Sequence, residues 1–363
     1  MPEQHGGGST GLEDGQLTTH LDGVRSAFAD AAERCDGISV TRLRLGGAVA
    51  ELRFASPVLH AQLARAFAHL AIPAESSVAD FTVSLWDSSS TGAQPPPRPL
   101  VPDDYAEGAL FHFHQPPIRM AYQPGLESLS VLDADTNSAW HWVADAASQP
   151  YWDKASPIRQ ILFWWLSSIG YLQVHGAAVG TEHGGVMLVG RGGSGKSTTA
   201  LSSFGSEVRY VGDDYVAFTL DPEPRVQSLY SSGKLEPEHL QARLPHLFPL
   251  LANADELDSE KAVVYLYEHF PESIVATLPL RAVLVPKVMR GQTETRVVEG
   301  SKAAAFAALA PSTIFQLHTA GPETLSMMSR LVASVPCFGL ELGSDIAGIP
   351  RAIAEFLSRF PRA

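Results

Sequence analysis

The chain has 363 residues, of which 45% are hydrophobic and 18% charged, which is enough apolar material for buried cores and excludes wholesale disorder. Its 26 Lys and Arg against 39 Asp and Glu give a formal net charge of −13. This acidic balance argues against a nucleic-acid partner, because a general polyanion binder carries a basic surface. At about 150 residues per domain, the length predicts two domains.

The N-terminal residues 1–20 are predicted to form a flexible tail, because they are polar, include three consecutive glycines and show no periodicity. They lack the apolar segment of a secretory signal. A membrane span is considered at residues 161–180, but polar residues and glycines interrupt it halfway, which favours a buried helix running into a buried strand. Cys35 and Cys337 are too far apart for a disulfide framework. We therefore expect a cytoplasmic protein with no membrane partner.

Residues 21–150 are predicted to form a small, mostly β N-terminal domain. From about Gly37, apolar and polar residues alternate on both sides of Gly46-Gly47, which is typical of a β-hairpin. Pro57–Leu70 has the spacing of an amphipathic helix, and the Ser- and Pro-rich segment Asp87–Asp104 predicts a loop. Further strands are predicted at Phe81–Trp86, Phe111–Phe113, Arg119–Gln123, Ser128–Asp133 and Ser138–Val143.

Residues 151–363 alternate strands, Gly-rich turns and helices, which predicts an α/β domain. The predicted strands are Val174–Val179, Val186–Val189, Val208–Val211, Val216–Leu220 and Leu280–Val288. The predicted helices run from Ser156-Pro157 to about Ile169 and over Ser301–Leu309, Pro322–Val335 and Asp345–Phe360.

The segment GRGGSGKS at residues 190–197 matches the phosphate-binding pattern G-x-x-x-x-G-K-[ST] in full. The apolar strand before it and the helix-forming TTALSS after it favour a P-loop over a chance Gly-rich turn. Its glycines let backbone N–H groups surround phosphate, Lys196 adds a charge for the β- and γ-phosphates, and Ser197 can ligate Mg²⁺. The predicted nucleotide site comprises Gly190, Arg191, Gly192, Gly193, Ser194, Gly195, Lys196, Ser197 and Thr198.

Asp213 and Asp214 follow an apolar strand about 15 residues after the loop. Adjacent side chains at a strand end point in different directions, so one carboxylate can face a metal and the other an acceptor. Either aspartate alone would be interpreted as part of a turn, and the nearby P-loop favours function. By themselves, His175 and Lys234 would be interpreted as a core histidine and a solvated lysine.

Four segments in this order, VHG, GRGGSGKST, GDDYV and YSSGKLE, resemble the catalytic domain of HPr serine kinase/phosphorylase. They are also similar to the nucleotide site of ATP-dependent phosphoenolpyruvate carboxykinase. The resemblance covers residues 170–240 closely and the C-terminal half loosely. Within this superfamily the chain is most similar to the HPr-kinase-like tailoring kinases of lasso and other ribosomal peptides, which have a pattern similar to APSTIFQL at 310–317 and VPCFGLELG at 335–343. The implied fold is α/β: an HPr kinase/phosphoenolpyruvate carboxykinase-like P-loop domain, preceded by the small β-rich domain.

The resemblance also implies roles for individual residues. The backbone of residues 190–196 binds the phosphates of ATP, and Ser197 with Asp214 holds Mg²⁺. Asp213 is the base that takes the proton of the acceptor hydroxyl, and His175 lies near the transferred phosphate.

The sequence departs from the family at two places. Thr198 stands where HPr kinase has Glu, and the Gly-Arg-Asn core of the phosphorylase signature is absent, which predicts a kinase without phosphorylase activity. Lys234 matches a phosphate-facing lysine of the carboxykinase.

The expected activity is Mg²⁺-dependent transfer of the ATP γ-phosphate to a hydroxyl, most readily a Ser of a peptide or small protein such as a ribosomal peptide precursor. Two alternatives stay open: a carboxykinase-like metabolic enzyme, and a nucleotide-gated peptide-binding module without transfer. The N-terminal domain is expected to select the acceptor. HPr kinases form hexamers, so a homo-oligomer also stays open.

Overall fold

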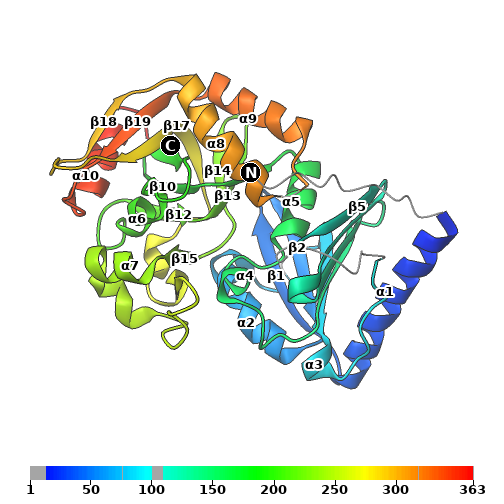
Figure 1. The fold of residues 1–363 in the computed structure, drawn as a ribbon. Helices are drawn as coiled ribbons and strands as arrows, with labels where there is room; N and C mark the ends of the chain where they lie inside the picture. Colours follow the sequence, from blue (N-terminus) through cyan, green and yellow to red (C-terminus); the bar gives the residue numbers. More distant parts are fainter. Residues whose placement is uncertain (1–13, 76, 100–108, 318, 363) are drawn as a thin grey trace. The chain divides into compact units, whose positions relative to one another are not determined.

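A computed structural model describes residues 14–75, 77–99, 109–317 and 319–362 (Figure 1). The chain divides into two compact units that interleave in sequence. The first unit comprises the chain up to residue 64, residues 71–149 and residues 158–165. The second comprises residues 65–70, residues 150–157 and the chain from residue 166 onwards.

The first unit is built on an eight-stranded mixed sheet with the order β3-β1-β2-β4-β8-β7-β6-β5. The predicted hairpin is confirmed, because β1 and β2 pair antiparallel and their turn residues Gly46 and Gly47 have φ of +58° and +87°. The strands are β1 (Ser39–Leu45), β2 (Ala48–Phe54), β3 (Ala71–Ile72), β4 (Phe81–Asp87), β5 (Phe111–Gln115), β6 (Ile118–Gln123), β7 (Ser128–Asp133) and β8 (Ser138–Val143).

Helix α1 (Asp14–Arg34) corrects the expectation of a tail through residue 20, because residues 14–20 are helical. Leu17, Leu21, Val24 and Phe28 recur at helical spacing and join a core that contains Trp86, Trp140 and Trp142. Residues 1–13 lie outside the described part of the chain.

Short helices lie between the strands along this part of the chain. The predicted helix at residues 57–70 is confirmed as α2 (Pro57–Phe67) followed by η1 (Ala68–Leu70). The segment predicted as a loop from Asp87 contains α3 (Ser88–Thr91), which the buried Asp87 carboxylate caps by accepting from Ser90 N at 2.7 Å. Residues 100–104 of that predicted loop lie outside the described residues. A further turn, η2, spans Pro124–Leu126.

The second unit is built on a nine-stranded mixed sheet, in which seven strands follow the order β12-β10-β11-β17-β14-β13-β9. The other two strands branch from β17, because β19 pairs with β17 and β18 pairs with β19. The strands are β9 (Leu172–His175), β10 (Ala177–Thr181), β11 (Gly184–Leu188), β12 (Arg209–Gly212), β13 (Tyr215–Thr219), β14 (Arg225–Ser228), β17 (Thr277–Val288), β18 (Arg296–Glu299) and β19 (Cys337–Leu342). A separate two-stranded sheet pairs β15 (Ser232–Leu235) with β16 (Ala262–Tyr265).

The predicted strand Val174–Val179 is wrong as one element, since Gly176 separates β9 from β10. The Gly176 N–H leaves the strand pattern to donate to Asp214 O at 3.1 Å. A Cβ on Gly176 would lie 3.0 Å from Leu188 O, so glycine permits the close approach of two backbones at this break.

Helices pack on this sheet in two groups. Residues of α6, α7 and α10 share one core with alternate residues of β10, β11, β17 and β19. Helix α8 packs against α9 and against β9, β17 and β19. The helices after residue 150 are α4 (Tyr151–Lys154), α5 (Arg159–Ser168), α6 (Lys196–Leu201), α7 (Pro237–Arg243), α8 (Lys302–Gln316), α9 (Pro322–Ser334) and α10 (Gly348–Leu357), with 3-10 turns η3 (Pro245–Leu250), η4 (Leu266–Glu268) and η5 (Pro271–Ser273). Most of α5 belongs to the first unit.

Within the described ranges, no helix is both long enough and apolar enough to cross a membrane. The apolar stretch at residues 161–180 is divided among α5, β9 and β10.

Candidate functional site

The register of the sheet brings the P-loop and the two aspartates to one edge. Ala178 of β10 pairs with Met187 of β11 on one side and with Gly212 of β12 on the other. Both neighbours run antiparallel to β10, so β11 and β12 end at the same edge of the sheet. The loop that follows β11 and the Asp213-Asp214 pair that follows β12 therefore lie side by side.

The P-loop depends on glycine at two positions. Gly193 and Gly195 have φ of +76° and +104°, in the region that other residues rarely adopt. A Cβ on Gly195 would also lie 2.3 Å from Leu342 Cδ1. Among the described residues, no carbonyl accepts the backbone N–H of Gly192, Gly193 or Gly195, so these donors are available to an anion.

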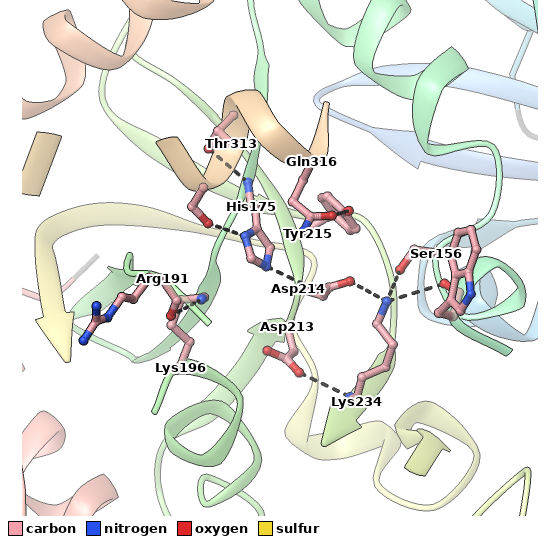
Figure 2. A network of polar contacts seen from close by, with 12 residues as sticks. Ser156, His175, Arg191, Lys196, Asp213, Asp214, Tyr215, Lys234, Thr313 and Gln316 are labelled. Atoms are coloured by element: carbon pink, nitrogen blue, oxygen red, sulfur yellow. Dashed lines mark hydrogen bonds and ion pairs between the residues drawn. The ribbon is translucent and has the colours of Figure 1, made fainter. Parts of the chain in front are cut away.

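Lys196 is buried at the start of α6. Its Nζ donates to the loop carbonyls Gly190 O at 2.7 Å and Arg191 O at 3.4 Å (Figure 2). Burial lowers the pKa of Lys196, and the carboxylates of Asp213 and Asp214 oppose this effect. The lysine thus lies within electrostatic range of both aspartates.

A tight turn directs the two aspartates to different partners. Tyr215 N–H donates to Asp213 O at 2.8 Å, which closes a three-residue turn around Asp214. Asp214 has a φ of +67°, which is uncommon for any residue but glycine and is best tolerated by Asn and Asp. Such strained residues concentrate at functional sites.

Asp213 is only 1% exposed. Its Oδ2 accepts from the backbone N–H of Lys234 at 3.3 Å, and in the part of the chain that the structure describes its Oδ1 has no hydrogen-bond partner. Burial and the neighbouring Asp214 raise the pKa of Asp213, while the Lys234 N–H and the nearby Ser197 hydroxyl lower it. The structure therefore places Ser197 beside Asp213, whereas the sequence predicts that Ser197 acts with Asp214.

The oxygens around Asp213 fit a magnesium ion. An unpartnered buried carboxylate oxygen and a Ser hydroxyl are hard ligands, and Mg²⁺ in nucleotide sites takes one or two protein oxygens together with phosphates and waters. The described residues contain no group of three or more His, Cys, Asp and Glu that could hold a metal by themselves.

Asp214 is held by His175 and Lys234 and remains partly exposed, with 25% of its side chain accessible. His175 Nε2 lies 3.3 Å from its Oδ1, and Lys234 Nζ forms an ion pair with its Oδ2. Burial raises the pKa of Asp214, but Lys234 and His175 outweigh burial and hold that pKa well below its usual value. His175 reaches this position because β9 and β13 pair it with Tyr215, the residue after Asp214.

Lys234 belongs to the small β15-β16 sheet and is almost buried. Besides Asp214, its Nζ donates to Ser156 Oγ at 3.3 Å and to Trp152 O at 3.4 Å, and lies 5.9 Å from the ring centroid of Tyr215. The resemblance implies that this lysine faces phosphate, and in this structure its ammonium faces a carboxylate.

The structure thus brings together six of the predicted residues, namely His175, Lys196, Ser197, Asp213, Asp214 and Lys234. The Arg191 side chain is exposed and points away from this network (Figure 2). Sequence reasoning missed further residues that contact the network, and these are Trp152, Ser156, Tyr215, Ser312, Thr313 and Gln316. The segment APSTIFQL contains the last three of them.

Comparison with known proteins finds no matching family model and no matching curated protein. Eighty-five chains of solved structures match, among them the structure titled HPr(Ser) kinase/phosphatase from Coxiella burnetii. That match has 10% sequence identity and a TM-score of 0.28, and covers 52% of this chain and 93% of that chain. At this sequence identity and TM-score, the match gives no information about the activity of this chain. What the structure defines is a mixed α/β chain with a Gly-rich loop and an aspartate pair at one edge of its larger sheet.

Proposed function

We propose that this chain is a phosphotransferase that moves the γ-phosphate of ATP to the hydroxyl of an acceptor in the presence of Mg²⁺. The observation that carries the proposal is the convergence of the P-loop Lys196 with two aspartates in contrasting environments, one buried and one reachable from solvent. Phosphoryl transfer needs these parts: a phosphate cradle, a metal carboxylate and a group that orients the nucleophile.

Asp213 with Ser197 is the pair that we assign to Mg²⁺. Asp213 is too buried for an acceptor to reach, its Oδ1 has no hydrogen-bond partner among the described residues, and the Ser197 hydroxyl lies near its carboxyl group. When bound, Mg²⁺ would neutralise charge on the β- and γ-phosphates. This assignment exchanges the roles that the sequence predicts for the two aspartates.

Asp214 is the residue that we assign to the acceptor, since a quarter of its side chain is accessible. Its low pKa makes it a weak base, yet the transition state of phosphoryl transfer is loose and the acceptor keeps its proton until late. The main role of Asp214 is therefore to orient the acceptor hydroxyl by accepting its hydrogen bond. As the O–P bond forms and the bond to ADP breaks, the hydroxyl proton passes to Asp214.

His175 and Lys234 keep the Asp214 carboxylate in one orientation, since each binds a different oxygen.

For the acceptor we propose a Ser hydroxyl of a peptide or small protein, on the strength of the sequence resemblance, and for the first unit we propose a part in choosing it. The absence of the phosphorylase signature supports transfer in the forward direction.

The test uses the full chain with Mg²⁺ and γ-phosphate-labelled ATP. Two peptide mixtures serve as acceptors, identical except that Ser in one is Ala in the other. We expect label in the Ser mixture, and no label with Lys196→Ala, because the charge that holds the β- and γ-phosphates is lost. ATP binding by calorimetry without transfer to any peptide would instead favour a nucleotide-gated binding module. ADP formation that depends on oxaloacetate would favour a carboxykinase-like enzyme.

A further inference from the structure

The last turn of α8 contacts the site through three side chains (Figure 2). Ser312 Oγ is hydrogen-bonded to His175 Nδ1, and Thr313 Oγ1 accepts from the His175 backbone N–H at 3.3 Å. Gln316 Oε1 accepts from the Tyr215 hydroxyl at 3.2 Å. Ser312 and Gln316 are four residues apart and share a helix face, so one turn contacts both His175 and Tyr215.

These contacts fix which nitrogen of His175 carries the proton. The Asp214 carboxylate is ion-paired with Lys234 and accepts hydrogen bonds, so the His175 Nε2 that lies 3.3 Å from its Oδ1 is the nitrogen that carries a proton. In the neutral ring Nδ1 is then an acceptor, and the Ser312 hydroxyl donates to it. Ser312, His175 and Asp214 therefore form a continuous chain of hydrogen bonds, in which the imidazole lies between a hydroxyl and a carboxylate.

We infer that Ser312 is a positioning residue that holds His175 in one tautomer and one ring orientation, with Nε2–H directed at Asp214. Without the Ser312 hydroxyl, Nδ1 loses its donor, and the ring can rotate or exchange tautomers. Lys234 would then hold the Asp214 carboxylate through a single oxygen. The consequence for catalysis rests on the proposed function, in which Asp214 orients the acceptor.

Substitution of Ser312 is well suited to a test because it does not weaken the helix. Ala has a higher helix propensity than Ser, so Ser312→Ala removes the hydroxyl and keeps α8 helical. Ser312→Thr restores a hydroxyl at the same Cβ. Ser301→Ala is the matched control on the same helix, since Ser301 caps the distant end of α8 by accepting from Ala304 N at 3.1 Å.

The first readout is independent of activity and uses the full chain with ¹⁵N-labelled histidines, at a pH where imidazole is neutral. Two-bond ¹H–¹⁵N correlation spectra distinguish a protonated from an unprotonated ring nitrogen, and the signal lost in His175→Gln assigns the residue. We expect protonated Nε2 and unprotonated Nδ1 in the parent chain, in Ser312→Thr and in Ser301→Ala. In Ser312→Ala we expect both nitrogens to shift toward the averaged values of exchanging tautomers.

The second readout is the rate of ADP release with Mg²⁺ and ATP, measured together with Mg-ATP affinity by calorimetry. Loss of an orienting partner of this kind lowers activity by roughly 10- to 100-fold. We expect that fall in kcat for Ser312→Ala, recovery in Ser312→Thr, and unchanged Mg-ATP affinity in both.

A tautomer signature in Ser312→Ala identical to that of the parent chain would overturn the inference. So would an altered signature with an unchanged kcat, because Ser312 would then have no influence on the reaction. If the parent chain releases no ADP and labels no acceptor, the proposed function fails, and the spectra still decide whether Ser312 holds His175.

Discussion

At the scale of single residues, Asp213 and Asp214 are neighbours in the chain with opposite surroundings. Burial raises the pKa of Asp213, whereas Lys234 and His175 outweigh burial and lower the pKa of Asp214. The three-residue turn around Asp214 produces this contrast, because it directs one carboxylate inward and the other toward Lys234 and His175. Each aspartate can therefore be tested separately for its part in metal binding, turnover and stability.

The first prediction concerns kinetics. Asp213→Asn is expected to raise the Mg²⁺ concentration needed for turnover, because it replaces the proposed metal carboxylate. Asp214→Asn should leave Mg-ATP affinity nearly unchanged and lower kcat by about 10²- to 10⁴-fold, as is typical for a positioned acid–base group. Asn tolerates the positive φ of residue 214, so the variant isolates the charge. Mg²⁺ titrations of ADP formation measure both effects, and the reverse pattern would restore the roles predicted from the sequence.

The same two variants are expected to move stability in opposite directions. Asp214→Asn leaves Lys234 almost buried without its carboxylate, and should cost roughly 2–4 kcal/mol in free energy of unfolding at pH 7. Asp213→Asn removes a buried charge with an unpartnered oxygen, and should stabilise the chain by about 1 kcal/mol.

The pH dependence follows from the signs of the two shifts. Because the pKa of Asp214 is lower in the folded than in the unfolded state, its carboxylate stabilises the fold at pH values above the unfolded-state pKa of about 3.9. This stabilisation is lost as pH falls toward the folded-state pKa. Because the pKa of Asp213 is higher in the folded state, its ionised carboxylate lowers the free energy of unfolding at pH values above that folded-state pKa. Protonation of Asp213 removes this destabilisation as pH falls. Urea unfolding at neutral pH and below pH 4 measures the free energy of unfolding of each variant and of the parent chain. For both variants, the difference from the parent chain should be smaller in acid. A difference that persists unchanged in acid would exclude charge as its cause.

Motif spacing selected Lys196, Ser197 and the Asp pair as candidates, because strand, loop and helix follow a known pattern, and the structure brings these residues together. Motif spacing could not tell which carboxylate meets Ser197, since that depends on a turn with positive φ at Asp214. Ser312 is more than a hundred residues away from His175 in the chain, and helix packing alone brings it to the site.

At the scale of elements, the P-loop offers a matched pair of glycine substitutions. Gly195→Ala should abolish Mg-ATP binding, because residue 195 has a φ of +104° and a Cβ would collide with Leu342. Gly192→Ala should retain binding, since its φ is ordinary and nothing lies within 4 Å of the position that a Cβ would occupy. Calorimetry with Mg-ATP measures both, and circular dichroism checks that both variants fold. Equal binding by the two variants would contradict the geometry of the loop.

Elements with strong local patterns were predicted from the sequence, and elements that depend on distant partners were not. The Gly46-Gly47 hairpin and α2 follow from alternation and helical spacing. The segments β16 and β18 are short, and each becomes a strand by pairing with a neighbour across a long stretch of chain. Helix α8 continues through Pro311, although proline normally ends a helix, and this brings Ser312 to the site.

At the scale of the whole molecule, the second unit includes a segment from far upstream in the chain. Residues 65–70 contribute a bidentate ion pair from Arg65 to Glu268, at 2.6 and 2.9 Å, and a ring contact at 5.4 Å between the buried Phe67 and Tyr230. His69 Nε2 lies 2.7 Å from Ser228 Oγ. A cut at residue 150 would remove all of these contacts from the second unit.

We therefore predict that a fragment of residues 151–363 is less stable than the full chain. Loss of a buried Phe alone costs about 3–5 kcal/mol, which is a large part of the stability of a typical domain. Thermal unfolding followed by near-ultraviolet circular dichroism compares the two. As a control in the full chain, Phe67→Ala should lower the transition temperature, and Val58→Ala, at an exposed position of α2, should not. A fragment that melts at the temperature of the full chain would show that residues 65–70 are dispensable.

The interleaving of the two units also bears on how the chain is made. Residues 65–70 leave the ribosome long before β17 and β19, which complete the sheet of the unit to which these residues belong. At about 5–20 residues per second, synthesis from Leu70 to Leu342 takes roughly 15 to 50 s. During that interval Phe67, which is buried in the finished protein, has no second unit to enter. Nascent chains of this protein should accordingly depend on a chaperone that shields this short apolar segment until the C-terminal strands emerge.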